Sequence, residues 1–275
     1  MGIKDILVHL DTSDGGECVA DFAVSLATEF KAYLTAAGLA LKIIPPDSFM
    51  GEYPYDLMLE ATENARQAAD AAFNKLRAGA PPTVQTDLLM IEAVAGEARS
   101  EFGKLARHFD LAVVGQGGPD YGGDDELMAE GALFRSGRPV FVVPRIHKGA
   151  AKLGKAMVCW DGGLPAARAL AAAMPLLKRA GSVEVVSIAS KRLPSDELPG
   201  FNISRHMARH EIQATLRKLP HADDIGACLL SHAADSGADY MVMGAYGHSR
   251  FREFVLGGAT RTMLQSMTVP AFMAH

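Results

Sequence analysis

The stretch KAMVCWDGGLPAARALAAAMPLLKRAGSVEVVSIAS, residues 155–190, contains an apolar run, an alanine-rich helical pattern and a second apolar run. The apolar runs are short and lack strict alternation, which is typical of strands buried on both faces of a parallel sheet. The middle pattern predicts a helix that begins near Leu164, kinks at Pro175 and ends by Gly181. A strand–helix–strand unit of this kind needs helices on both faces of its sheet.

The same plan occurs earlier in the chain. The segments IKDILVHLD, GECVADFAVSLATEF and AYLTAAGLA repeat the order of strand, helix and strand, and Asp11 corresponds to Asp161. Later in each half, VQTDLLM matches EIQATLR, DLAVVG matches DYMVMG, and RPVFVVP matches TVPAFMAH. This repeat predicts an α/β fold with two tandem Rossmann-like domains, each a five-stranded parallel sheet with helices on both faces.

We place the two domains at residues 1–147 and 152–275, because residues 145–154 form a polar, glycine-containing joint. The first half has an extra segment, residues 43–58, whose prolines predict a loop; a lid, a dimer contact and simple decoration all remain open for it. The pattern of residues 59–79 predicts a long helix that ends at Gly79, before two consecutive prolines.

Composition excludes several classes of function. With 49% hydrophobic and 21% charged residues, the chain is typical of a soluble globular protein. Its net charge is -5, and no run of Lys and Arg suggests a nucleic-acid partner. The apolar stretches are broken by charges and by Pro175 before they reach the roughly 20 residues of a membrane span.

The start of the chain and its cysteines predict a cytoplasmic location. Asp5, Asp11 and Asp14 stand where a secretory signal needs an apolar run. The 3 cysteines lie far apart, without a pair that would form a disulfide framework or a CxxC site. We therefore expect a reducing compartment and buried thiols.

The segment MVMGAYGHSRFREFVLGGATRTMLQSMTVPAFM, residues 241–273, carries the clearest chemical signal. A buried strand ends at Gly244, Gly247 follows closely, and Gly257 precedes a second helical pattern. Glycines at a helix N-terminus let a phosphate approach unpaired backbone N–H groups. At the carboxyl end of a parallel strand, this spacing predicts a phosphate-binding site.

The spacing Gly244-x2-Gly247-x9-Gly257 resembles the nucleotide-binding motif of the universal stress protein family. The whole chain is similar to a tandem, two-domain member, although the motif is present only in the second half. The resemblance implies a cytosolic stress-response protein that binds ATP, or ADP or AMP, with Mg²⁺ as a candidate ion bound together with the nucleotide. It also implies a homodimer or an intramolecular pseudo-dimer, with residues 139–143 and 269–273 meeting near its axis.

The family's functional positions transfer to this sequence through the motif. Asp161 corresponds to the residue that faces the ribose and adenine, and Ile188 to the one whose backbone meets the adenine edge. Gly244 corresponds to the position against the ribose. The phosphates would be held by Gly247, His248, Gly257, Gly258, Ala259 and Thr260. The family usually has Ser or Thr where this chain has Gly258, which removes one hydroxyl from the site.

Simpler explanations stand beside these roles. The glycines after the strand could serve only a tight turn, and Asp161 could serve only the start of the next helix. In the first half, Asp124, Asp125, Glu126 and Glu130 are expected to crowd the phosphate position, so we expect no ATP there.

Other chemistries find little support in the sequence. His206 and His210 are four residues apart but lack a third ligand nearby, and Cys159 lies within an apolar run, so we assign no metal site. The sequence contains no GxSxG and no P-loop, and we assign no catalytic residue. An adenine-nucleotide-regulated protein is therefore the first hypothesis, a scaffold with a vestigial site the second, and a weak ATPase the third.

Overall fold

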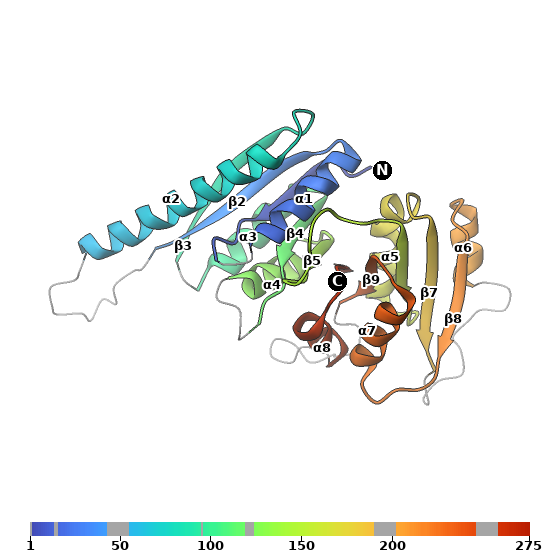
Figure 1. The fold of residues 1–275 in the computed structure, drawn as a ribbon. Coiled ribbons are helices and arrows are strands. Elements are labelled where there is room, and N and C mark those ends of the chain that lie inside the picture. Colours follow the sequence, from blue (N-terminus) through green and yellow to red (C-terminus); the bar gives the residue numbers. More distant parts are fainter. Residues whose placement is uncertain are drawn as a thin grey trace. The chain divides into compact units, whose positions relative to one another are not determined.

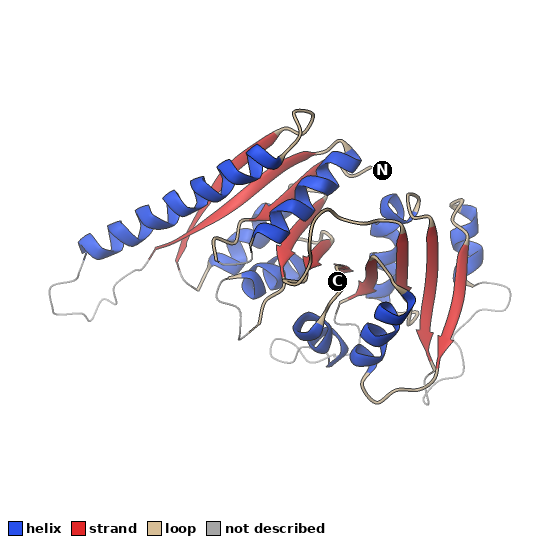
Figure 2. Ribbon diagram, viewed as in Figure 1, coloured by secondary structure: helices blue, strands red, loops and turns tan. Residues whose placement is uncertain are grey.

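A computed structural model of the chain describes residues 2–13, 16–42, 55–94, 96–118, 124–189, 202–245 and 258–275. Strands and helices alternate along each repeat, and helices cover both faces of the strands (Figures 1 and 2). After its first two residues the chain divides into two compact units, residues 3–138 with 148–150, and residues 139–147 with 151–275. The predicted α/β fold with two tandem Rossmann-like halves is confirmed.

The first unit contains four parallel strands in the order β3-β2-β1-β4. Its core strand β1 has Ile6, Leu7 and Val8 fully buried, because both faces of the sheet are covered. Helix α1 packs against α2, and α3 packs against α4. The elements are β1 (Asp5–His9), α1 (Glu17–Phe30), β2 (Tyr33–Lys42), α2 (Tyr55–Gly79), β3 (Thr86–Val94), α3 (Ala98–Ala106), β4 (Leu111–Gly115) and α4 (Asp125–Arg135).

The predicted long helix is present as α2, which ends at Gly79 as expected and begins at Tyr55. Residues 55–58, which the sequence placed in a loop, therefore form its first turn, because no proline interrupts the chain after Pro54. The rest of that predicted loop, residues 43–54, lies outside the described residues.

The second unit contains the strand order β5-β10-β9-β6-β7-β8. The five strands from β10 to β8 are parallel, as the repeat predicts. The elements are β5 (Val140–Val143), β6 (Lys155–Cys159), α5 (Leu164–Leu177), β7 (Ser182–Ile188), α6 (Ile203–Arg209), β8 (Ala214–Leu219), α7 (Ile225–Ser236), β9 (Tyr240–Gly244), α8 (Gly258–Ser266) and β10 (Ala271–Ala274).

The last strands of the two repeats meet, as the family resemblance implied. β5 pairs antiparallel with β10, with Phe141 opposite Phe272. The two rings are fully buried and pack edge to face with centroids 5.3 Å apart. β5 therefore belongs to the same compact unit as the second repeat, although it follows the first repeat in sequence.

Helix α5 ends earlier than its sequence pattern predicts. Its last helical residue is Leu177, and Pro175 lies within its final turn. The N–H groups of Arg179 and Ala180 bond to carbonyl groups three residues back rather than four, so the chain leaves the helix in a tighter turn before it reaches Gly181. In the described part of the chain, no helix combines the length and hydropathy needed to cross a bilayer.

Candidate functional site

The strand order of the second unit places a topological switch point between β6 and β9. From β6 the chain proceeds to β7 and β8 on one side, and returns to β9 and β10 on the other. Open α/β sheets bind ligands in the crevice outside the carboxyl ends of the strands at such a point. Asp161 lies two residues after β6, Gly244 ends β9, and Ile188 ends the neighbouring β7. These three predicted site residues are therefore at one edge of the sheet.

Of the residues predicted to bind phosphate, the structure describes only the last three, Gly258, Ala259 and Thr260. Gly247, His248 and Gly257 lie outside the described residues. Gly258 is the first residue of α8, followed by Ala259, and the first turn of this helix contains no acidic residue. Thr260, the third helical residue, is 4% exposed. The described portion thus contains a helix N-terminus without a carboxylate of its own, which suits an anion.

Gly244 has a packing role that the sequence left open. A Cβ atom at this position would lie 2.4 Å from the backbone nitrogen of Ala166 and 2.6 Å from the carbonyl carbon of Pro165. The end of β9 therefore approaches the first turn of α5 so closely that only glycine fits. The need for glycine here follows from packing alone, whether or not a ribose lies nearby.

Asp161 also has a local role. Its Oδ1 accepts a hydrogen bond of 2.8 Å from the backbone N–H of Gly163, the residue that precedes α5. Gly162, between them, has a φ of 76°, which favours glycine. The first repeat has the same turn, in which the backbone N–H of Ser13 donates to Asp11 Oδ1 at 2.9 Å. The repeated aspartate thus shapes the turn after the first strand in both halves.

Cys159, at the end of β6, does not present a reactive thiolate. Burial, together with the nearby carboxylate of Asp161, raises the pKa of its thiol to about 12. The thiol is therefore neutral at physiological pH and is a poor nucleophile and metal ligand. Cys18, Cys159 and Cys228 are free cysteines of intermediate exposure as whole residues, so the expectation of buried thiols holds only in part.

His206 and His210 lie close together, but two side chains are fewer than a metal site normally needs. His206 lies on α6 and His210 follows its end, and their ring centroids are 4.9 Å apart. Within the described ranges, no group of three or more His, Cys, Asp or Glu side chains is arranged to hold a metal ion.

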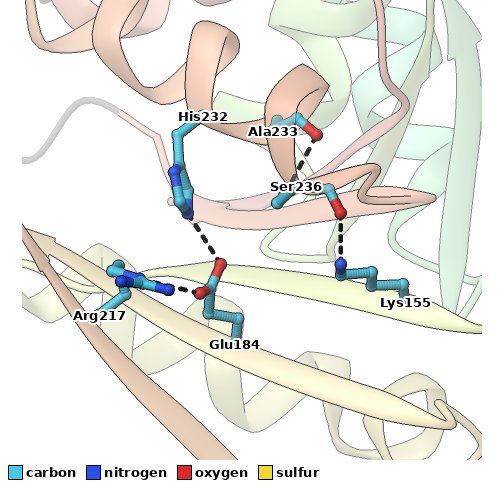
Figure 3. A network of polar contacts seen from close by, with 6 residues as sticks. All are labelled: Lys155, Glu184, Arg217, His232, Ala233 and Ser236. Carbon is cyan, nitrogen blue, oxygen red and sulfur yellow. Dashed lines mark hydrogen bonds and ion pairs between the residues drawn. The ribbon is translucent and has the colours of Figure 1, made fainter.

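A polar network that the sequence analysis did not predict joins α7 to the sheet of the second unit (Figure 3). Glu184, on β7, pairs with His232 Nε2 on α7 at 2.8 Å and with Arg217 Nε on β8 at 3.4 Å. Nearby, the Lys155 ammonium group donates to the backbone carbonyl of Ser236. Period-2 and helical patterns carry no information about pairing between distant elements, so no local pattern signals this network.

The Glu184 carboxyl is acidic despite its partial burial. Burial pushes its pKa upward, but the hydrogen bonds from His232 and Arg217 and their charges together hold the pKa below its usual range. The carboxylate form of Glu184 is therefore favoured. Together with the contact between Lys155 and Ser236, the network links the strands β6, β7 and β8 to helix α7.

The corresponding region of the first unit is built differently. Of the four acidic residues expected to crowd it, Asp124, Asp125, Glu126 and Glu130, only Asp125 is buried. Glu130 pairs with Arg99 at 2.8 Å instead. Asp125 Oδ1 lies 2.7 Å from His9 Nδ1, and His9 is itself 4% exposed. No local sequence pattern predicts the His9–Asp125 pair, because the two residues are 116 positions apart.

No protein-family model and no curated protein matches the sequence. Solved structures do match over almost the whole chain. A universal stress protein from Archaeoglobus fulgidus DSM 4304 has a TM-score of 0.71 at 14% identity, covering 98% of this chain and 97% of its own. A putative universal stress protein from Pseudomonas aeruginosa UCBPP-PA14 has a TM-score of 0.54 at 14% identity, covering 99% and 93%.

The same fold also occurs in a different setting. The cytoplasmic domain of a prokaryotic cation chloride cotransporter has a TM-score of 0.51 at 12% identity, covering 99% of this chain and 96% of its own. Identities at this level show a common fold rather than a common activity. The chain therefore has, over nearly its full length, the fold of universal stress protein structures, with one α/β repeat in each half.

Proposed function

We propose that this chain is a tandem universal stress protein that binds ATP, or a related adenine nucleotide such as ADP or AMP, in its second half. The observation that carries the proposal is the switch point between β6 and β9, flanked by Asp161 and Gly244. The nucleotide, with or without Mg²⁺, acts as a regulatory ligand of a cytoplasmic stress-response protein. It shifts the population of conformations or partners to the extent that it binds two states differently.

The distribution of charge favours an anionic ligand in the second half. Residues 151–275 contain 14 Lys and Arg against 10 Asp and Glu, whereas residues 1–150 contain 13 against 22. An excess of positive charge raises the local concentration of a polyphosphate and speeds its association. The glycines around the start of α8 add backbone N–H donors for the phosphates.

A nucleotide-free scaffold is the second candidate, and two observations favour it. Gly244 is required by the packing of β9 on α5, and Asp161 is engaged in the turn before α5. Both residues would be needed in a protein that had lost its ligand. In this scaffold hypothesis, the pairing of β5 with β10 makes the chain an intramolecular pseudo-dimer.

Titration calorimetry of the nucleotide-stripped chain with ATP and Mg²⁺ separates the two candidates. We expect one binding site per chain, and we expect the double variant Gly247→Glu, Gly257→Glu to lose it, because two carboxylates would meet the phosphates. A control with the same added charge is Gly79→Glu, Gly96→Glu, since a side chain at either position meets nothing within 4 Å. Absence of binding heat and of thermal stabilisation by ATP would refute the proposal and favour the scaffold.

A further inference from the structure

The first unit contains a buried ionisable pair at the carboxyl end of its central strand. His9 is the last residue of β1, and Asp125 is the first residue of α4. Their side chains meet at 2.7 Å and are 4% and 1% exposed. The ring of Phe102 packs edge to face on His9, with centroids 5.8 Å apart. A buried carboxylate at hydrogen-bond distance from a histidine strongly resists separation, because either partner alone would be buried without compensation.

Two glycines show how tightly α4 closes on the end of β4. A Cβ atom at Gly115 would lie 2.0 Å from Asp125 Oδ2, and one at Gly117 would lie 2.4 Å from the Cβ of Glu126. The first turn of α4 therefore lies directly on the loop that follows β4. In the first unit, these glycines provide room for the side chains of Asp125 and Glu126.

Asp125 lies at the N-terminus of a helix. The first turn of a helix has unpaired N–H groups and a partial positive charge, which attract an anion. Asp125 is itself the first helical residue of α4, whereas the first turn of α8 contains no acidic residue. Among the described residues, the first turn of α4 thus contains a carboxyl group and the first turn of α8 does not.

We infer that the His9–Asp125 pair is an autoinhibitory latch, in which Asp125 takes the place of an anionic ligand and His9 holds it there. The latch keeps the crevice at the carboxyl ends of β1 and β4 closed, so that the first half does not respond to nucleotide. The inference stands without the proposed function, because it concerns a contact within the first unit.

Hydrogen exchange of the full-length chain tests the latch. In Asp125→Asn we expect the amides of β4 and of the first turns of α4 to exchange at least about tenfold faster, because local opening no longer breaks the buried contact between His9 and Asp125. Glu126→Gln is the matched control, since it makes the same change at the exposed neighbouring residue. The double variant His9→Gln, Asp125→Asn should recover part of the protection, because two amides can pair.

The same experiment with ATP added requires no variant. In the wild-type chain, the amides of β4 and α4 should exchange at the same rate with and without ATP, whatever happens in the second half. Protection of β4 and α4 by ATP would overturn the latch, and so would an unchanged exchange rate in Asp125→Asn. Equal loosening of β1, β2 and β3 in that variant would also overturn it, because the pair would then support the whole unit. Absence of ATP protection anywhere would refute the proposed function and leave the latch to be decided by the variants.

Discussion

At the scale of single residues, the core of the second unit contains one polar atom that works against stability. Tyr240 is fully buried, and its hydroxyl has no hydrogen-bond partner in the described part of the chain. Burial, with a smaller effect of the Asp239 carboxylate, raises the pKa of the phenol, so the hydroxyl is neutral. We predict that Tyr240→Phe increases the free energy of unfolding by about 1 kcal/mol, because a buried unpaired hydroxyl costs about 1–3 kcal/mol.

Urea unfolding measures this change. The midpoints can be compared if the free energy of unfolding falls with urea concentration at the same slope in both proteins. The control is Tyr33→Phe, because Tyr33 is 51% exposed and its hydroxyl is available to water. A lower midpoint for Tyr240→Phe would show that the hydroxyl has a partner, such as a buried water molecule.

At the scale of elements, the network around Glu184 makes the attachment of α7 sensitive to acid. The hydrogen bonds and charges of His232 and Arg217 outweigh the effect of burial and keep the pKa of Glu184 below its ordinary value of 4.5. The unfolded chain then binds more protons than the folded chain as the pH falls through this range, so stability falls with it. We predict that Glu184→Gln is less stable than the wild type above about pH 5, and that the difference shrinks below that pH.

Unfolding midpoints measured at several pH values test this, and Glu92→Gln serves as the control. Lys42 and Arg66 also lower the pKa of Glu92, mainly through their hydrogen bonds, but Glu92 is open to solvent. The change in unfolding midpoint caused by Glu92→Gln should therefore be small and should disappear in high salt. A difference between Glu184→Gln and the wild type that stays constant down to low pH would contradict the prediction.

The elements also show what periodicity can and cannot predict. The apolar runs and alanine-rich patterns identify the strands and helices, because burial of a regular element imposes its period on the sequence. The same patterns misplace the end of α5, where the backbone changes to hydrogen bonds three residues apart before Gly181. The start of α2 was also misplaced, because the prolines before residue 55 predict a break without marking where it ends.

The candidate site was only partly predictable for a related reason. Glycine spacing identifies the switch-point edge, since a strand must end and a helix must begin there. The contact between Gly244 and α5 and the pairing of His9 with Asp125 depend on how distant elements pack. No local pattern encodes such contacts, so a single sequence cannot separate a glycine kept for packing from one kept for a ligand.

At the scale of the whole molecule, the position of β5 decides where the chain can be divided. The repeat predicts a boundary between residues 147 and 152, yet residues 139–147 belong to the compact unit of the second repeat. We predict that a fragment of residues 139–275 is more stable than one of residues 152–275. Without β5, β10 becomes an open edge of the sheet, and Phe272 loses its contact with Phe141. The loss of that contact is comparable to a Phe→Ala change in a core, which costs about 3–5 kcal/mol.

Urea unfolding of the two fragments gives the comparison, and Phe141→Ala in the longer fragment shows how much of the difference comes from that ring. If the longer fragment is more stable and Phe141→Ala removes much of the gain, the second repeat needs a strand from beyond the repeat boundary. The two halves then cannot have been separable modules joined by a simple linker, because one of them is completed by the end of the other. Equal stabilities would contradict this and favour the boundary that the repeat predicts.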